Sequence, residues 1–347
     1  MNLSTLINGF VQLGKVMHLH GKNQAWTGFE TGVTEQEFQF FENQIIAQTF
    51  RNNWFTENNI RESLYNLSTW LKPDKLNDWL SKYSTTNSPK TIAVIMAGNI
   101  PLVGFHDFMC VLFSGNRALL KLSSDDDLLL PLLVQYLQSF IPEIEQRIEF
   151  VKGPLKSFDA VIATGSNNSL LHFKSYFEKY PHLLRHNRTS LAVLEGNETL
   201  EELKLLGKDI FSYFGKGCRN VTHLIVPRGY DFQLFFQAIV DFGEIINNKK
   251  YGNNYDYNKA IHLMNREVFL DNNFLLVKED KQLHAPISMI YYHTYTTKQE
   301  IQRYLEENVL NLQCIVGKGF TPFGEAQCPT LTDYADGIDT MKWLSEV

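Results

Sequence analysis

Cys218 is the residue of this sequence whose surroundings best suit chemistry. It lies in FSYFGKGCRNVTHLIVP, residues 211–227, between a helical pattern and a β-branched run. Two glycines just before it let the backbone turn sharply, and Lys216 and Arg219 flank it. Neighbouring cations favour a thiolate, a strong nucleophile toward carbonyls and thioesters. The alternative is a small buried side chain at a tight turn, which is a common state of free cysteine.

The remaining cysteines and the missing motifs narrow the chemistry. Cys110 and Cys314 lie in apolar stretches, where we expect core positions, and we assign Cys328 no role. No C-x-x-C pair or zinc-ligand spacing occurs, so we expect no metal site and reduced thiols in a cytoplasm. The sequence also lacks G-x-G-x-x-G after a strand, the P-loop and G-x-S-x-G. A standard Rossmann dehydrogenase, a P-loop NTPase and an α/β-hydrolase are therefore disfavoured.

Composition and charge describe an ordinary globular chain. The chain has 347 residues, a length that suits one large or two ordinary domains. Its apolar fraction of 44% and charged fraction of 20% are ordinary globular values, and its net charge is −6. No dense Lys/Arg run is present, so we expect no nucleic-acid partner. The N-terminus lacks the basic start of a signal peptide, and the longest apolar run, 128–134, is too short to span a bilayer. We expect a cytoplasmic protein with no membrane span.

The elements that position Cys218 follow from the apolar pattern. Residues 1–85 show helical spacing, and 84–90 resemble a linker. From Thr91, short apolar runs at 91–98, 118–124, 147–153, 158–165 and 189–196 predict strands, and 101–114, 128–140 and 168–184 predict helices. Such alternation is typical of a parallel sheet with helices on its faces. Ligands bind at the carboxyl ends of such strands.

A second α/β unit is predicted to begin after Gly196. Thr199 and Glu202 fit a capping box at the start of the next helix. The pattern then predicts a strand at 221–227, helices near 230–248 and 255–269, a strand at 286–295, a helix at 297–309 and a strand at 312–317.

The order of five short motifs resembles the aldehyde dehydrogenase superfamily. They are AGNIP (97–101), GNRALLKLSS (115–124), ATGS (163–166), LAVLEGNETLEE (191–202) and YFGKGCRNVTHLIVP (213–227). Within that superfamily the sequence is most similar to acyl-CoA reductases of the LuxC type, the fatty acid reductases of bacterial bioluminescence. The resemblance covers roughly residues 90–325 and rests on order, spacing and context together.

The resemblance implies catalytic roles for three residues. Cys218 matches the nucleophile that forms a thioester acyl-enzyme, and Asn99 matches the amide donor of an oxyanion hole, with the Cys218 backbone N–H as second donor. Such preorganised donors contribute roughly 3 kcal/mol each. Glu195 matches the general base of hydrolytic members. LEGN replaces the LGG of that pattern, and hydride rather than water attacks the acyl-enzyme in a reductase, so a structural strand-end carboxylate is an equal reading of Glu195.

The resemblance also implies a nicotinamide cofactor. Lys121 matches the lysine that touches the adenosine ribose, and Thr164, Gly165 and Ser166 match the turn near the phosphates and nicotinamide. Ser124 stands where NAD-preferring relatives often carry an acid, so it would not repel a 2′-phosphate and favours NADPH. Residues 125–127 are all Asp, and these acids weaken the preference for NADPH that Ser124 indicates. We expect them to form a solvated helix N-terminus.

Two histidines, His223 and His106, are weaker candidates for the active site. His223 is five positions after Cys218 on a predicted strand, where its side chain would face away. His106 with Asp107 follows the Asn99 turn, and we interpret them as a pair on a helix surface.

Together these patterns predict an aldehyde-dehydrogenase-like α/β fold with a Rossmann-like cofactor domain and a catalytic domain. We expect an NADP-binding domain with a helical N-terminal part at 1–195, a catalytic domain at 196–318, and a tail at 319–347 that returns to the first domain or to a partner subunit. The implied activity is NADPH-dependent reduction of an acyl-CoA, or a related acyl thioester, to the aldehyde. Alternatives are aldehyde oxidation and a non-redox, thioesterase-like acyl-binding protein. Whether the chain forms a homo-oligomer is left open.

Overall fold

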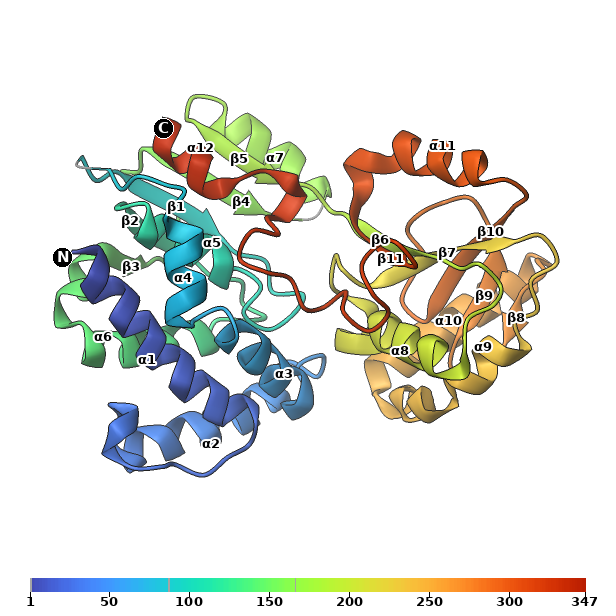
Figure 1. The fold of residues 1–347 in the computed structure, drawn as a ribbon, viewed down its shortest axis with the longest axis horizontal. Coiled ribbons are helices and arrows are strands. Elements are labelled where there is room, and N and C mark those ends of the chain that lie inside the picture. Colours follow the sequence, from blue (N-terminus) through green and yellow to red (C-terminus); the bar gives the residue numbers. More distant parts are fainter. Residues whose placement is uncertain (1, 87, 166) are drawn as a thin grey trace. The chain divides into compact units, whose positions relative to one another are not determined.

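The chain forms two compact units. The computed structural model describes residues 2–86, 88–165 and 167–347. Unit 1 runs to His186 and also includes Thr330–Val347, and unit 2 is Asn187–Pro329 (Figure 1). The sequence predicts a boundary near residue 195, whereas the compact units divide just before the strand that begins at Thr189. No helix in the described ranges is long and apolar enough to cross a membrane.

Unit 1 begins with four helices, which confirm the helical N-terminal part. They are α1 (Leu3–Gly21), α2 (Glu35–Arg51), α3 (Glu57–Ser68) and α4 (Pro73–Leu80). The Thr34 hydroxyl accepts a hydrogen bond from the backbone N–H of Glu37 and so caps the first turn of α2. Fully buried Phe10, Leu13 and Met17 form the apolar face of α1.

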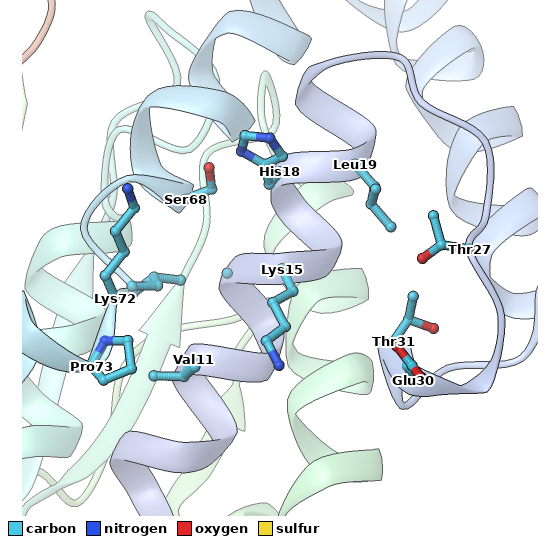
Figure 2. A pocket seen from close by; sticks show the side chains of 12 residues that line it. Val11, Lys15, His18, Leu19, Thr27, Glu30, Thr31, Ser68, Lys72 and Pro73 are labelled. Atoms are coloured by element: carbon cyan, nitrogen blue, oxygen red, sulfur yellow. The ribbon is translucent and has the colours of Figure 1, made fainter.

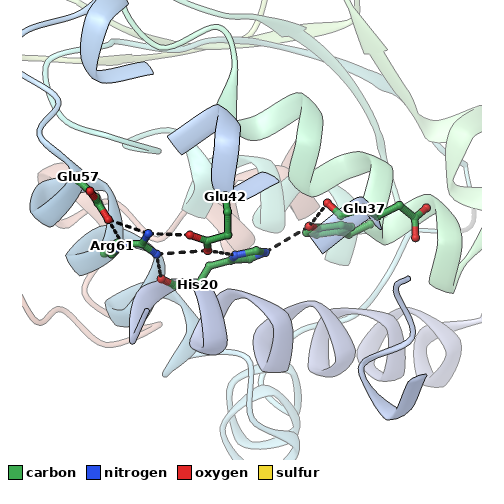
Figure 3. A network of polar contacts seen from close by, with 6 residues as sticks. His20, Glu37, Glu42, Glu57 and Arg61 are labelled. Atoms are coloured by element: carbon green, nitrogen blue, oxygen red, sulfur yellow. Dashed lines mark hydrogen bonds and ion pairs between the residues drawn. The ribbon is translucent and has the colours of Figure 1, made fainter. Parts of the chain in front are cut away.

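A buried polar cluster ties these helices together (Figure 3). The His20 ring on α1 contacts the Glu42 carboxylate on α2, with 2.5 Å between Nδ1 and Oε1. Arg61 on α3 donates to the other oxygen of Glu42 at 2.7 Å and to the carbonyl oxygen of His20 at 2.6 Å. Because the His20 ring is fully buried and stacks on Phe38 and Phe41, this cluster fixes the packing of α1 against α2 and α3.

The sheet of unit 1 is entirely parallel. Its order is β3-β2-β1-β4-β5. The strands are β1 (Thr91–Ile95), β2 (Arg117–Lys121), β3 (Ile148–Phe150), β4 (Ala160–Thr164) and β5 (His182–Arg185). Helices α5 (Phe105–Phe113) and α6 (Leu129–Phe140) pack with Val94 and Ile162 on one face. Helix α7 (Asn167–Phe177) covers the other face, where it packs against Ala93 of β1 and Val161 of β4.

One predicted helix of unit 1 is wrong at its end. The helix expected at 168–184 stops at Phe177, and His182–Arg185 form β5 beside β4. Pro181 lacks a backbone N–H and cannot continue a helix, and Leu183 is buried in the core under β4. A short apolar stretch beyond the proline therefore joins the sheet.

A buried ion pair joins β5 to α5. Arg185 donates to both carboxylate oxygens of Asp107, at 2.6 and 3.1 Å. Asp107 is only 7% exposed, so the expected surface pair with His106 is wrong. Arg185 also donates to the carbonyl oxygen of Ala335 and to the hydroxyl of Thr340 in the final helix, α12 (Thr340–Glu346).

Unit 2 contains a six-stranded sheet in the order β11-β6-β7-β10-β9-β8, parallel except for β8 against β9. The strands are β6 (Thr189–Val193), β7 (Val221–Pro227), β8 (Leu270–Asp271), β9 (Leu276–Glu279), β10 (Met289–Tyr295) and β11 (Leu312–Gly317). Its helices are α8 (Leu200–Phe211), α9 (Gln233–Ala238), α10 (Lys249–Met264) and α11 (Lys298–Asn308). Because β6 pairs with β7 and β11, it belongs to this sheet and not to the first one.

Short 3-10 segments complete the chain. The long helix predicted near 230–248 is wrong, because α9 ends at Ala238 and a 3-10 segment follows at Val240–Asn247, where Gly243 weakens an α-helix. The other 3-10 segments are Phe29–Thr31, Pro142–Arg147, Ser212–Gly215, Val309–Asn311 and Ala335–Gly337.

Candidate active site

Unit 1 gathers the predicted oxyanion-hole residue Asn99 and the predicted cofactor residues at the carboxyl edge of its sheet. Asn99 follows β1, Lys121 ends β2, Ser124 follows it, and Thr164 ends β4 just before Gly165. The strand order reverses between β1 and β4, which is the switch point where open α/β sheets bind ligands. Ser166, the last residue of the predicted turn, lies outside the described residues.

The turn that carries Asn99 packs closely against the segment after β2. A Cβ atom added to Gly98 would lie 2.6 Å from the Ser123 hydroxyl oxygen and 3.0 Å from the Cβ of Asp125. Such contacts are too short for any side chain, so this position requires glycine. Asn99 itself is half-buried at the tip of the turn.

The three aspartates after Ser124 are not all solvated, so that expectation is wrong for one of them. Asp126 is 7% exposed, and its Oδ2 accepts a hydrogen bond from the backbone N–H of Leu102 at 2.7 Å. Burial raises the pKa of the Asp126 carboxyl to about 7. Asp125 and Asp127 are exposed, and Asp127 pairs with Arg51 at 2.9 Å.

A cavity of about 1150 Å³ lies beside Lys121. The loop after β3 and helix α7 complete its wall, with Lys152, Lys156, Phe158, Phe173 and Tyr176 among the lining residues. The ammonium of Lys121 donates a hydrogen bond to the carbonyl oxygen of Gly153 at 3.1 Å. Cations beside aromatic rings suit the phosphates, ribose and adenine of a nucleotide, so these residues fit the adenosine half of a nicotinamide cofactor.

A second cavity, of about 510 Å³, lies among the N-terminal helices (Figure 2). Its lining combines Val11, Leu19 and Pro73 with the charged side chains of Lys15 and Lys72. None of the residues predicted to be functional lines this cavity. It is separate from the carboxyl edge of the sheet.

The backbone before Cys218 adopts a conformation that few sequences accept. Tyr213, Phe214 and Gly215 have φ values of +53°, +60° and +76° in succession. A left-handed conformation is costly for residues with a side chain. Cys218 follows in a turn that leads into β7, and its side chain is half-buried.

Asn220 holds this turn and was missed by sequence reasoning. Its amide Nδ2 donates to the carbonyl oxygens of Asp209, Ile210 and Ser212 at 3.0, 3.2 and 2.8 Å, and its Oδ1 accepts from the N–H of Gly217 at 2.7 Å. Asn220 is fully buried. It therefore satisfies carbonyls at the end of α8 and fixes the residue before Cys218. The available signal was an amide two positions after the cysteine.

Cys218 is also tied to the neighbouring strand. The Ser190 hydroxyl on β6 donates to the carbonyl oxygen of Cys218 at 3.0 Å. Of the two cations expected to favour a thiolate, Arg219 donates to the carbonyl oxygen of Ala326 at 3.4 Å. That guanidinium is therefore partly engaged away from the thiol.

Glu195, which the resemblance matches to a general base, follows the end of β6, whereas Cys218 lies beside the start of that strand. Cys218 lies just before β7, and the first residue of β7 pairs with Ser190 near the start of the parallel strand β6. Glu195 instead follows the end of β6. The five residues from Ser190 to Glu195 span roughly 16 Å of strand. The carboxylate is exposed, and buried Glu198 accepts from the backbone N–H groups of Glu195 and Gly196.

His223 takes part in a buried pair and not in a site with Cys218. Its Nε2 lies 2.6 Å from Nδ1 of His293, and its Nδ1 lies 2.8 Å from the carbonyl oxygen of Gln282. Burial lowers the pKa of both imidazoles to about 4. Both rings are therefore neutral near pH 7.

Comparison with known proteins identifies the family. The model of the family described as acyl-CoA reductase (LuxC) matches residues 33–233, which is more than half of the chain. The chain belongs to the LuxC family of acyl-CoA reductases. It is thus an oxidoreductase of the LuxC type. A search of curated proteins found no matching sequence.

Solved structures show the fold of this LuxC-family chain. The indole-3-acetaldehyde dehydrogenase AldA of P. syringae, in complex with NAD+ and IAA, matches with a TM-score of 0.64 at 11% identity, covering 91% of this chain and 72% of that one. An NAD+ complex of a Bacillus cereus aldehyde dehydrogenase matches with a TM-score of 0.59 at 13% identity, covering 91% of this chain and 72% of that one. Aldehyde dehydrogenase C of P. syringae, with NAD+ and octanal, matches with a TM-score of 0.57 at 12% identity, covering 85% of this chain and 69% of that one. These likenesses confirm the aldehyde-dehydrogenase-like α/β fold.

Proposed function

We propose that this LuxC-family protein reduces an acyl thioester, such as an acyl-CoA, to the aldehyde with NADPH, through an acyl-enzyme on Cys218. The observation that carries the proposal is the turn around Cys218. Three left-handed residues precede it, and Asn220 fixes Gly217 within it. A strained turn that is held by buried hydrogen bonds and presents one half-buried thiol is typical of a functional site.

The first step forms the acyl-enzyme. The Cys218 thiolate attacks the thioester carbonyl carbon, the bond from that carbon to the sulfur of CoA breaks, and CoA leaves as its thiol after taking up a proton. Negative charge develops on the carbonyl oxygen during attack. In this proposal the Asn99 amide and the backbone N–H of Cys218 donate hydrogen bonds to that oxygen.

The second step reduces the acyl group. NADPH, when bound, supplies the hydride that converts the thioester carbonyl into a thiohemiacetal. The carbon–sulfur bond to Cys218 then breaks, releasing the aldehyde and regenerating the thiolate. The overall balance is one acyl thioester, one NADPH and one proton consumed for one aldehyde, one NADP+ and one free thiol.

The cofactor residues follow the same proposal. We place Lys121 and Ser124 at the adenosine ribose, and Thr164, Gly165 and Ser166 toward the phosphates and nicotinamide. Support comes from the cavity beside Lys121 and from the position of Thr164 and Gly165 at the switch point. Ser124 is exposed and uncharged, so it leaves room for a 2′-phosphate.

The position of Glu195 does not favour aldehyde oxidation. Hydrolysis of an acyl-enzyme needs a base that activates water near the thioester. Glu195 was the candidate, and it lies beyond the opposite end of β6.

Mass spectrometry tests the proposed function directly. Incubation with a panel of acyl-CoAs is expected to add one acyl mass to Cys218, and NADPH is expected to remove it and release aldehyde. Cys218→Ala should abolish both, whereas Cys328→Ala, which removes an exposed thiol, should change neither. Acyl-CoA reduction that persists in Cys218→Ala would refute the mechanism, and an acyl mass that NADPH never removes would instead support a non-redox acyl-binding protein.

A further inference from the structure

A buried carboxyl group connects the segment after β2 to the turn after β1. Asp126 Oδ2 accepts from the backbone N–H of Leu102 at 2.7 Å, and the carboxyl group is 7% exposed. Leu102 has a φ of +59°, a conformation that costs about 1 kcal/mol or more for a residue with a side chain. The hydrogen bond offsets part of this cost and selects that conformation.

A second hydrogen bond holds the same turn from the other side. The Ser63 hydroxyl on α3 donates to the carbonyl oxygen of Pro101 at 2.8 Å, and Ser63 is 6% exposed. The two bonds act on consecutive residues, Pro101 and Leu102, directly after the segment that carries Asn99. Together with the close packing at Gly98, they leave the turn little freedom.

The Asp126 segment is in turn anchored by α2. The side-chain amides of Gln48 and Asn52 both donate to the carbonyl oxygen of Asp125, at 3.0 and 3.2 Å. These two amides are 1% and 5% exposed. A continuous set of contacts therefore runs from the N-terminal helices to the Asn99 turn.

We propose that Asp126 is a positioning residue that fixes the Asn99 turn, so that the Asn99 amide is held ready to donate to the acyl oxygen. This inference rests on the proposed function, because Asn99 has a role only if an oxyanion forms. It also gives α2 and α3, which carry none of the predicted site residues, a part in catalysis as the support of that turn.

The chemistry of Asp126 indicates which substitutions are informative. Its Oδ1 has no hydrogen-bond partner among the described residues, so ionisation of this carboxyl would leave a buried charge poorly compensated. Asparagine keeps an acceptor oxygen for the Leu102 N–H at nearly the same volume. Alanine removes the acceptor and leaves that N–H without it.

The experiment compares Asp126→Ala, Asp126→Asn and the control Asp127→Asn, whose carboxylate is exposed and paired with Arg51. Four quantities are measured: the saturating rate and the half-saturating concentration of Cys218 acylation by an acyl-CoA without NADPH, the Kd of NADPH, and hydrogen exchange of residues 97–104. In Asp126→Ala we expect a roughly tenfold lower saturating rate and faster exchange, with the other two constants within about twofold. Asp126→Asn should recover to within about threefold of the unaltered protein, and Asp127→Asn should match it.

Several results would overturn the inference. They are an unchanged acylation rate or unchanged exchange in Asp126→Ala, a parallel loss of NADPH affinity, or an Asp126→Asn variant no better than Asp126→Ala. If Asp126→Ala does not fold, Ser63→Ala removes the other bond to the turn, and acylation as fast as in the unaltered protein would then count against the inference. If the unaltered protein is never acylated, the proposed function fails and this inference falls with it.

Discussion

The ammonium of Lys121 and the carbonyl oxygen of Gly153 are joined by a hydrogen bond of 3.1 Å. This bond holds the loop after β3 beside the end of β2. Lys152 precedes Gly153 in that loop and lines the same cavity. A lysine at this place can meet a phosphate on the ribose that Lys121 is expected to touch.

Lys152→Gln should therefore weaken the binding of a 2′-phosphate. We expect the Kd of 2′,5′-ADP to rise about tenfold, while that of 5′-AMP changes less than about threefold, because only the former carries the extra phosphate. Calorimetry measures both constants without turnover. Lys15→Gln, which alters a lysine of the other cavity, is the matched control. Equal weakening of both ligands would show that Lys152 does not contact the 2′-phosphate.

Asn220→Ala should damage both the fold of unit 2 and the acylation of Cys218. The substitution leaves α8 carbonyls and the Gly217 N–H without their buried partner, at a cost of about 3 kcal/mol or more. We expect a clearly lower free energy of unfolding in urea and at least a tenfold lower acylation rate. Asn220→Asp retains the acceptor but not the donors and should also be impaired.

Asn254→Ala is the control for Asn220, since the Asn254 amide donates to the carbonyl oxygen of Lys250 near the surface. Its unfolding and acylation should resemble those of the unaltered protein. If Asn220→Ala behaves like this control, the turn before Cys218 does not depend on the amide.

Glu195→Gln should leave acyl-CoA reduction nearly unchanged. The Glu195 side chain is exposed and follows the end of β6, whereas Cys218 contacts the start of that strand through Ser190. We expect a kcat for NADPH-dependent reduction within about twofold of the unaltered value. A loss of more than tenfold would restore Glu195 as a catalytic group.

Glu42→Gln should destabilise the protein in a pH-dependent way. Although its own burial opposes ionisation, hydrogen bonds and charge attraction from His20 and Arg61 lower the pKa of Glu42 to about 2. A carboxyl whose pKa is lower in the folded state stabilises that state above its unfolded pKa, near 4.5, and loses this effect as the pH falls toward 2. The difference in unfolding free energy between the two proteins should thus be largest near pH 6 and shrink below pH 4. A difference that stays constant from pH 6 to pH 3 would contradict this assignment.

The sequence predicted much of unit 1, because its signals are local. The runs at 91–98, 118–124 and 158–165 became β1, β2 and β4, and the Gly and Ser residues that follow them lie at one edge of the sheet. The capping pair of Thr199 and Glu202 was likewise visible, and α8 begins there. Caps and periodicity depend on residues only a few positions apart.

Errors arose where distant parts of the chain compete. The run at 189–196 has the same pattern as the strands before it, and only its pairing with β7 and β11 puts it in the second sheet. Asp107 next to His106 suggested a surface pair, but Arg185 on β5 buries its carboxylate. No local pattern carries that information.

By itself, the sequence determined the alternation of strands and helices, the glycine-rich turn at Cys218 and the motif order that indicates the LuxC family, since these depend on neighbouring residues and their spacing. Only the tertiary structure decided that Asp126 is buried against Leu102, that Asn220 holds the Cys218 turn, and that Glu195 and Cys218 occupy opposite ends of neighbouring strands. The reason is physical: burial and hydrogen-bond partners are set by segments that meet only after folding, and they decide which polar side chains can act.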